Sequence, residues 1–223
     1  MLRPQTFVAK ILAPKFEPFT ITGGIFLFTL LYYTRKIPLQ IVSFIVLILV
    51  TALWAHTIRQ RGLSWSDFKL SKKQLWLQVI IALGLSIFGW FYFRQYVIWT
   101  RGTEIPFGYG GNFLAVITIV LVASTEEIYF RGYLQNRIQP HFRMLARVLI
   151  AVFAMAFYKN IVHIWEGMSL LAHLELLFVG ILHNILPSLW MEWSDNLWGA
   201  LLLHVFWDLL VYAPLIEIPY WVF

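Results

Sequence analysis

Apolar stretches long enough to cross a bilayer recur along the chain, and polar or charged stretches separate them. A transmembrane helix needs about 20 consecutive, mostly apolar residues. By that measure the pattern predicts spans at 20–34, 39–57, 74–98, 108–130, 144–165, 168–190 and 196–213. The first two flank Arg35-Lys36-Ile37-Pro38, and they could instead form one broken hairpin. We therefore predict an all-α fold, a polytopic transmembrane helical bundle of about seven or eight spans.

The composition agrees with an integral membrane protein. The 223 residues are 60% hydrophobic and 13% charged, with a mean hydropathy of +0.73, whereas a soluble domain has about 25% charged residues. The length suits one compact bundle. We expect an N-terminal arm at 1–19, amphipathic or lying on the membrane surface, and a single transmembrane domain at 20–223. Because the chain has no cysteine, disulfides, thiolate metal sites and a cysteine nucleophile are excluded.

The net charge of +6 is unevenly spread, since all 17 Lys and Arg residues lie between Arg3 and Lys159. Residues 59–73 hold five bases and one acid, and residues 137–147 hold three bases and no acid. The positive-inside rule predicts that both segments lie on the cytoplasmic side. In a membrane protein such clusters indicate topology and contact with anionic lipid. Nothing in the chain resembles a nucleic-acid-binding module, so the bilayer is an expected partner and nucleic acid is not.

Charged residues appear abruptly in STEEIYFRGYLQNR, residues 124–137, after an uncharged run at 113–123. Each Glu or Arg at mid-bilayer costs roughly 2.5–3.5 kcal/mol on insertion scales, so these residues must be compensated inside the protein. Glu127 and Arg131 are four residues apart, share a helical face and can pair. Glu126 is rotated by about 100° from Glu127 and is not the natural partner of Arg131. A carboxylate in that position is suited to general acid or base catalysis.

Two further polar groups interrupt the later apolar spans. His204 and Asp208 are again four residues apart on one face. Lys159, Asn160 and His163 fall towards the end of their span. Ionisable residues inside a membrane are functional by default, so we take the three groups together as a candidate site. His173, Glu175 and His183 are interpreted as hydrogen-bonded or interfacial residues.

Two other patterns argue against alternative functions. The glycine-rich FGYGGNF at 107–113 lacks the Lys-Ser/Thr of a phosphate-binding loop, so we interpret it as a loop that opens a helix. No internal repeat is evident, and the inverted-repeat plan of many transporters is therefore not supported.

The charged segments together resemble a known family. EEIYFRGYLQ, residues 126–135, resembles the first motif of the CAAX protease and bacteriocin-processing family (CPBP or Abi), which includes the Ras-converting CAAX prenyl endopeptidases. That motif is Glu-Glu-x3-Arg, usually followed by Gly. HVFWD, residues 204–208, resembles the last motif, His-x3-Asn or Asp, and His163 falls where the middle motif, Phe-x3-His, ends. The resemblance runs from about Arg59 through the last span.

The resemblance implies an intramembrane glutamic endopeptidase that uses neither metal nor cofactor. Glu126 and His163 would activate a water for attack on a peptide carbonyl, and His204 with residue 208 would stabilise the oxyanion. Its substrate would be a peptide or protein, lipid-modified if processing is of the CAAX type.

The remaining residues of the motifs receive supporting roles. By the resemblance, Glu127 and Arg131 would hold Glu126 in place. An ionised Asp cannot donate a hydrogen bond and would repel an oxyanion. We therefore expect Asp208 to orient His204 and favour its protonated form, or to be protonated itself.

The middle motif departs from the family pattern, because Lys159 stands where the family has Phe. Since Lys159 and His163 are four residues apart, we expect them to share a helical face. Lys159 would then bring a positive charge to the substrate pocket, and Asn160 is a second candidate pocket residue.

Three alternatives stay open. A catalytically inactive family member could serve as an immunity factor, a chaperone or a scaffold, and Lys159 favours this hypothesis. A zinc-dependent membrane hydrolase could use Glu126, His163 and His204 as ligands, although no HExxH motif is present. A transporter or proton relay could use the same charges.

Overall fold

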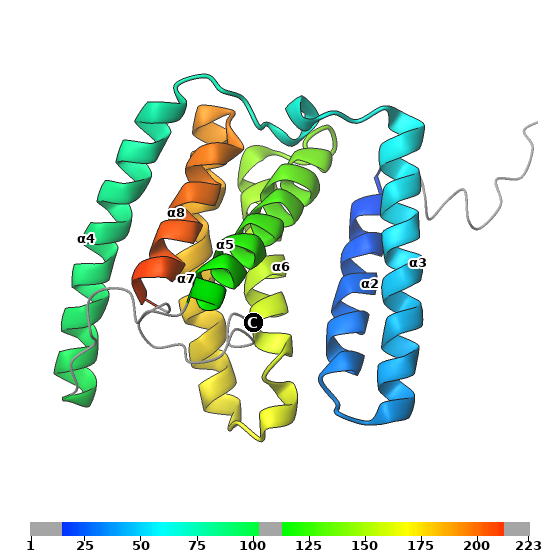
Figure 1. The fold of residues 1–223 in the computed structure, drawn as a ribbon, viewed down its shortest axis with the longest axis horizontal. Helices are drawn as coiled ribbons and strands as arrows, with labels where there is room; N and C mark the ends of the chain where they lie inside the picture. Colours follow the sequence, from blue (N-terminus) through cyan, green and yellow to red (C-terminus); the bar gives the residue numbers. More distant parts are fainter. Residues whose placement is uncertain (1–14, 103–112, 212–223) are drawn as a thin grey trace, which may run out of the picture. The chain divides into compact units, whose positions relative to one another are not determined.

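The computed structural model describes residues 15–102 and 113–211 of the chain. Helices account for all the regular structure of these residues, with no strand among them, so the all-helical prediction is confirmed (Figure 1). The long helices are α2 (Glu17–Tyr32), α3 (Ile37–Arg61), α4 (Leu75–Arg101), α5 (Phe113–Glu127), α6 (Met144–Ile161), α7 (Leu170–Ser194) and α8 (Leu197–Val211). The short ones are η1 (Trp65–Phe68), the π-helix η2 (Ile128–Gln135) and η3 (Ile164–Glu166).

Four helical segments within the described residues are long and apolar enough to cross a membrane. They are Ile37–Arg61, Leu75–Tyr96, Met144–Glu166 and Leu170–Ser194. Two shorter apolar helices, α2 and α8, have 16 and 15 residues. The predicted total of seven or eight spans therefore stays a prediction. Most of the glycine-rich stretch at 107–113 lies outside the described residues, and its last residue, Phe113, begins α5.

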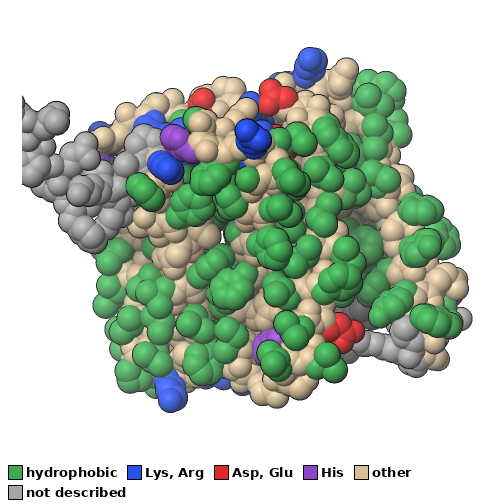
Figure 2. Space-filling view, turned by 180° about the vertical axis from the view of Figure 1, so that it is seen from behind, with side chains coloured by type: hydrophobic (Ala, Val, Ile, Leu, Met, Phe, Trp, Pro, Cys, Tyr) green, Lys and Arg blue, Asp and Glu red, His purple; other side chains and the backbone are tan. Residues whose placement is uncertain are grey.

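Large hydrophobic side chains are exposed along the candidate spans. On α3 they include Ile41, Phe44, Ile48 and Leu49. Figure 2 shows hydrophobic side chains over most of the face that it draws. Soluble proteins rarely expose continuous apolar patches of this kind, whereas a surface against lipid requires them.

The chain divides into two compact units. Unit 1 consists of Met1–Asp67 and Gly132–Ile185, and unit 2 of Phe68–Arg131 and Leu186–Phe223. The expectation of a single transmembrane domain at 20–223 stays a prediction, and each unit is described by itself below.

In unit 1, α2 and α3 form a helical hairpin, and α2 also packs near α6. The rings of Phe19 and Phe142 lie 6.1 Å apart at the start of α2, and Trp165 Nε1 donates to the carbonyl of Leu30, 2.9 Å away, near its end. The segment before α6, which contains Phe142, and the segment after α6, which contains Trp165, therefore contact opposite ends of α2.

The predicted arm at 1–19 stays a prediction, and its last residues belong to α2. Residues 1–14 lie outside the described residues, but Glu17 is the first residue of α2 and only 1% exposed. Pro18 follows it at a position where the missing N–H costs the helix nothing. The sequence suggested that Glu17 lies on the surface, because its partners are far from it along the chain and no local spacing indicates them.

In unit 2, α8 packs against both α4 and α5. Ala82 of α4 joins Leu203 of α8 in one buried cluster, and the hydroxyl of Ser86 donates to the carbonyl of Leu203 at 3.2 Å. The close approach requires a glycine on α4, because a Cβ at Gly89 would lie 2.7 Å from the ring of Trp207. The two helices are therefore in close contact along the turn that precedes His204 and the turn that follows it.

The start of α8 is fixed by the polar connector that precedes α4. The side-chain amide of Asn196 donates to the carbonyls of Ser71 and Lys73, at 3.1 and 3.0 Å. The backbone N–H of Leu197 donates to the carbonyl of Lys69 at 2.9 Å. The last of these bonds satisfies the N–H of the first residue of α8, which has no partner within its own helix, and together they set where α8 begins.

Candidate active site

Glu127 and Arg131 form a buried ion pair where α5 meets η2. Glu127 ends the regular helix, and the wider π-helical turns begin at Ile128. Arg131 Nη1 donates to Glu127 Oε1 at 2.8 Å, and both side chains are completely buried. The pair predicted from the four-residue spacing is confirmed. Its position is notable because π-helical turns are rare and frequently occur at functional sites.

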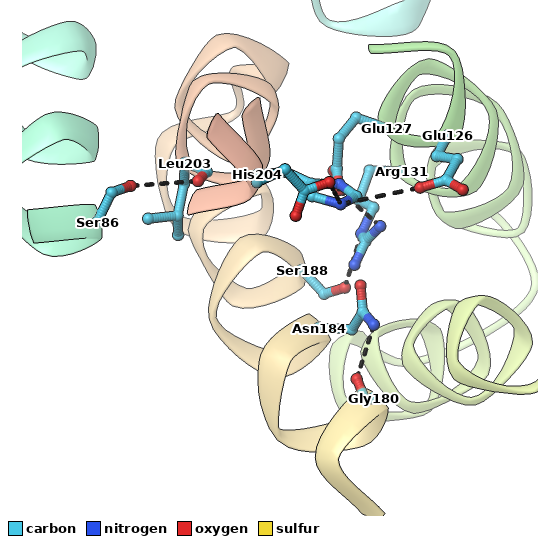
Figure 3. Close-up of polar contacts among 10 residues, drawn as sticks. Ser86, Glu126, Glu127, Arg131, Gly180, Asn184, Ser188, Leu203 and His204 are labelled. Atoms are coloured by element: carbon cyan, nitrogen blue, oxygen red, sulfur yellow. Dashed lines mark hydrogen bonds and ion pairs between the residues drawn. The ribbon is translucent and has the colours of Figure 1, made fainter. Parts of the chain in front are cut away.

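His204 approaches the same carboxylate from α8. Its Nδ1 lies 2.8 Å from Glu127 Oε1, and the side chain is buried (Figure 3). The contact follows from the packing of α5 on α8, which buries Ala123 against Leu201 and Val205. Because an ionised carboxylate can only accept, Nδ1 carries the hydrogen of this bond. Glu127 therefore fixes the orientation of the imidazole as well as binding Arg131.

The other ring nitrogen of His204 faces two more carboxylates. Nε2 lies 3.2 Å from Asp208 Oδ2, so the expected proximity of His204 and Asp208 is confirmed. Nε2 also lies 3.8 Å from Glu126 Oε2, and Glu126 is 5% exposed. That separation is too long for a direct hydrogen bond. It is short enough for one water to bond both atoms at ordinary lengths of about 2.8 Å.

The charges of the site do not balance if every group is ionised. Within unit 2, three carboxylates, Glu126, Glu127 and Asp208, face two basic groups, Arg131 and His204. A surplus negative charge among buried groups is costly. One proton shared by His204 and the carboxylates around Nε2 removes the surplus, and general acid–base chemistry needs such a proton.

Ser188 of α7 also belongs to this group, although reasoning from the sequence did not identify it. Its hydroxyl accepts a hydrogen bond from Arg131 Nε at 3.3 Å, and the residue is completely buried. Figure 3 shows Ser188 next to the guanidinium. A serine in an apolar helix has no spacing that indicates a partner 57 residues away. Ser188 fixes the side of the guanidinium that Glu127 does not contact.

His163, expected beside Glu126, lies in unit 1. Helix α6 ends at Ile161, and the backbone N–H of His163 donates to the carbonyl of Asn160 at 3.0 Å in a tighter turn. Lys159 is the third-last residue of α6 and His163 lies two residues beyond its end, so a shared helical face stays a prediction. The ring of His163 lies 2.7 Å from the carboxylate of Glu166. Its catalytic role stays a prediction.

Asn160 has a specific partner in His173. Its amide nitrogen donates to the backbone carbonyl of His173, and its amide oxygen lies 2.7 Å from His173 Nδ1. The interpretation of His173 as a hydrogen-bonded residue is confirmed. Lys159 is half-buried near the end of the same helix. The pocket roles of Lys159 and Asn160 stay predictions.

The zinc hypothesis needs Glu126, His163 and His204 around one ion. Glu126 and His204 lie together in unit 2, and His163 belongs to unit 1. No single unit assembles this ligand set, so the zinc site stays a hypothesis.

Fold and site together define a class, a helical membrane protein with a buried glutamate–histidine group. Comparison with protein families narrows that class. Residues 110–210 match the family described as type II CAAX prenyl endopeptidase Rce1-like. The match includes Glu126, Glu127, Arg131, His204 and Asp208, and it confirms the resemblance to the CAAX protease family. The matched segment covers less than half of the chain, and over these residues the chain is similar to CAAX-type proteases. The four long apolar helices among the described residues suggest an integral membrane protein. No curated protein and no solved structure matches the chain.

Proposed function

We propose that this protein is an intramembrane endopeptidase in which Glu126 and His204 act together on one water and one peptide bond. The observation that supports this most directly is the environment of His204. Its Nδ1 is fixed by Glu127, and its Nε2 faces Asp208 at 3.2 Å and Glu126 at 3.8 Å. A buried, oriented imidazole beside a carboxylate is the arrangement that general acid–base hydrolysis requires.

In the proposed reaction Glu126 acts as the general base. Its carboxylate takes a proton from water as the water oxygen bonds to the carbonyl carbon of the peptide. The resulting oxyanion accepts a hydrogen bond from His204, and a preorganised donor of this kind contributes roughly 2.7–4 kcal/mol. The proton held by Glu126 then passes to the amide nitrogen as the C–N bond breaks, which leaves a carboxylic acid and a free amine. The acid then loses its proton to solvent and becomes a carboxylate. No metal is needed for this sequence of steps.

His163 and Asp208 have proposed roles in the same reaction. His163 would share the activation of the water with Glu126, as the family resemblance implies. Asp208 would keep His204 protonated through the contact at Nε2, since an ionised carboxylate favours a neighbouring imidazolium. Glu127, Arg131 and Ser188 would be positioning residues, because each acts through another side chain.

The proposed substrate is a peptide or protein that reaches the site from the membrane. The family description names prenyl endopeptidases. A substrate of that kind carries a lipid on a cysteine near its C-terminus, so it partitions into the bilayer. We propose hydrolysis on the C-terminal side of such a cysteine.

Replacement of Glu126 tests the proposal directly. We expect Glu126→Gln to lower kcat/KM for a fluorogenic peptide with a farnesylated cysteine by at least roughly 100-fold, the lower end of what loss of a general base costs. Glu175→Gln is the matched control, since Glu175 is an exposed glutamate on α7. Equal activity of Glu126→Gln and the control would eliminate the enzyme proposal and favour an immunity, chaperone or scaffold function.

A chelator separates this mechanism from the zinc alternative. We expect peptide hydrolysis by the purified protein to continue in strong chelator. Loss of activity that added zinc restores would favour the zinc-dependent hydrolase instead.

A further inference from the structure

A second buried charge group lies in unit 1 and takes no part in the proposed reaction. Its centre is Glu17, and its other members are Tyr133, Arg61 and Arg137. The hydroxyl of Tyr133 donates to Glu17 Oε1 at 2.5 Å. Arg61 forms an ion pair with the other carboxylate oxygen, and Arg137 Nε lies 3.8 Å from Oε1. Three segments therefore meet at one carboxylate: the start of α2, the end of α3, and η2 with the residues that directly follow it.

The group carries more positive charge than Glu17 neutralises. Two guanidinium groups face one carboxylate, which leaves one positive charge in excess. Two of their donor atoms, Arg61 Nη1 and Arg137 Nε, are buried and have no hydrogen-bond partner within the described residues. Buried donors are almost always bonded in native proteins. The segment that precedes α2, residues 1–14, contains Arg3 and Lys10 and no acid. An additional anion is therefore the partner that this arrangement lacks.

The location of the group indicates what kind of anion reaches it. Arg61 is the last residue of α3, a 25-residue apolar helix that is about 37 Å long at about 1.5 Å per residue. Its end therefore extends beyond a hydrocarbon core of about 30 Å, to the level of the lipid headgroups. The ring of Trp54 packs against that of Tyr133 at 6.2 Å, and these aromatic residues are typical of that level. The Arg61 and Arg137 side chains are 22% and 27% exposed, so a ligand can contact them.

We propose that Arg61 and Arg137 form a binding site for the phosphate of an anionic phospholipid. Guanidinium groups bind phosphate through paired N–H donors, and basic pockets between transmembrane helices are typical sites for anionic headgroups. Glu17 holds the two arginines in place and limits their net charge. The bound lipid bridges the basic segments at 59–73 and 137–147.

Lipid binding to the purified full-length chain tests this site. Native mass spectrometry in detergent measures how strongly phosphatidylglycerol binds relative to phosphatidylcholine. We expect the wild-type protein to prefer phosphatidylglycerol by roughly tenfold or more, the factor that a charge-assisted hydrogen bond of about 1.5–3 kcal/mol provides. Equal binding of the two lipids would overturn the proposal. Inorganic phosphate should not displace the lipid, and displacement would overturn the assignment to a lipid.

Variants of three arginines separate the site from general attraction to an anionic surface. Arg61→Gln and Arg137→Gln should each weaken phosphatidylglycerol binding by roughly tenfold or more. Arg59→Gln is the matched control, since Arg59 is exposed in the same last turn of α3. In the control variant, phosphatidylglycerol binding should weaken by less than roughly fivefold. Equal losses in all three variants would overturn the proposal.

Glu17→Gln should change lipid binding in the opposite direction from the arginine variants. The substitution removes the internal anion but keeps a side chain of the same shape, so both guanidinium groups become available. We expect phosphatidylglycerol binding to become stronger than in the wild type. Weaker binding by a variant that unfolds at the wild-type temperature would contradict the competition between Glu17 and lipid phosphate.

Discussion

At the scale of single residues, the carboxylate of Glu127 has two partners, of which spacing in the sequence predicted only one. Glu127 was predicted to pair with Arg131, and it does so within one turn of helix. The same oxygen also lies 2.8 Å from His204 Nδ1. One carboxylate oxygen of Glu127 therefore both binds the Arg131 guanidinium and orients the His204 imidazole. Loss of any of these side chains leaves another buried without its partner.

Arg131→Met should be strongly destabilising for this reason. Breaking a buried ion pair by removing one partner costs about 3–5 kcal/mol. The second substitution in Arg131→Met/Glu127→Gln removes the stranded charge, so the double variant should lose less stability than the sum of the single variants. Chemical unfolding in detergent, followed by tryptophan fluorescence, measures the three losses. Strict additivity would show that the two side chains do not interact.

Variants of Asp208 test whether His204 Nε2 needs a negative charge beside it or only a hydrogen-bonding side chain. The oxygen of an asparagine amide can accept from Nε2–H, and its NH2 group can donate to an oxyanion. We expect Asp208→Asn to keep kcat/KM within roughly tenfold of the wild type, whereas Asp208→Ala should lose roughly 100-fold. If the two variants are equally impaired, the negative charge of Asp208 is itself required.

At the scale of secondary-structure elements, the site depends on how closely α8 approaches α4 and α5. Ser86 binds the carbonyl of Leu203, the residue before His204, and thereby fixes the height of α8 against α4. The apolar contact of Ala123 with Leu201 and Val205 fixes α8 against α5. These contacts place His204 opposite Glu127, which neither helix specifies alone.

Glycine at position 89 should be required for this packing. A Cβ at Gly89 would lie 2.7 Å from the ring of Trp207, so we expect Gly89→Ala to destabilise the protein by about 1–3 kcal/mol. Gly84→Ala is the matched control on the same helix, because a Cβ there meets no atom within 4 Å among the described residues. The control should be neutral or up to about 1 kcal/mol more stable. Thermal unfolding compares the two, and equal stabilities would contradict the close approach.

At the scale of the whole molecule, the structure supports part of the predicted topology. Arg61 and Arg137 come from the two basic segments that were predicted to share a membrane side, and both contact Glu17. Trp165, in the turn after α6, instead contacts Leu30 near the other end of α2. The assignment of the basic side to the cytoplasm stays a prediction.

Cysteine labelling can test that assignment, because the natural chain contains no cysteine. Gln60→Cys and Gln139→Cys place single thiols at exposed, uncharged positions in or beside the basic segments. Ser169→Cys places one in the exposed turn before α7. In inside-out vesicles a membrane-impermeant maleimide should label the first two and spare the third. Labelling of all three in sealed vesicles would contradict the topology.

The sequence by itself determined the features that depend on local helical geometry. Each predicted span overlaps an observed helix, because an apolar run of bilayer length has few other ways to satisfy its backbone. The pairs Glu127–Arg131 and His204–Asp208 also follow from a four-residue spacing, since such residues lie one helical turn apart. The Lys159–His163 pair stays a prediction, because α6 ends at Ile161 and a spacing rule holds only while the helix continues.

Only the tertiary structure decided which of these groups meet. The contact between His204 and Glu127 joins residues 77 positions apart, and Ser188 joins Arg131 from a third helix. The burial of Glu17 likewise depends on partners from α3 and from the residues that directly follow η2. Periodicity identifies the face on which a side chain lies, but which helix covers that face depends on packing across the whole chain. The sequence therefore suggested Glu126 as the proposed general base, and the fold decided which side chains surround it.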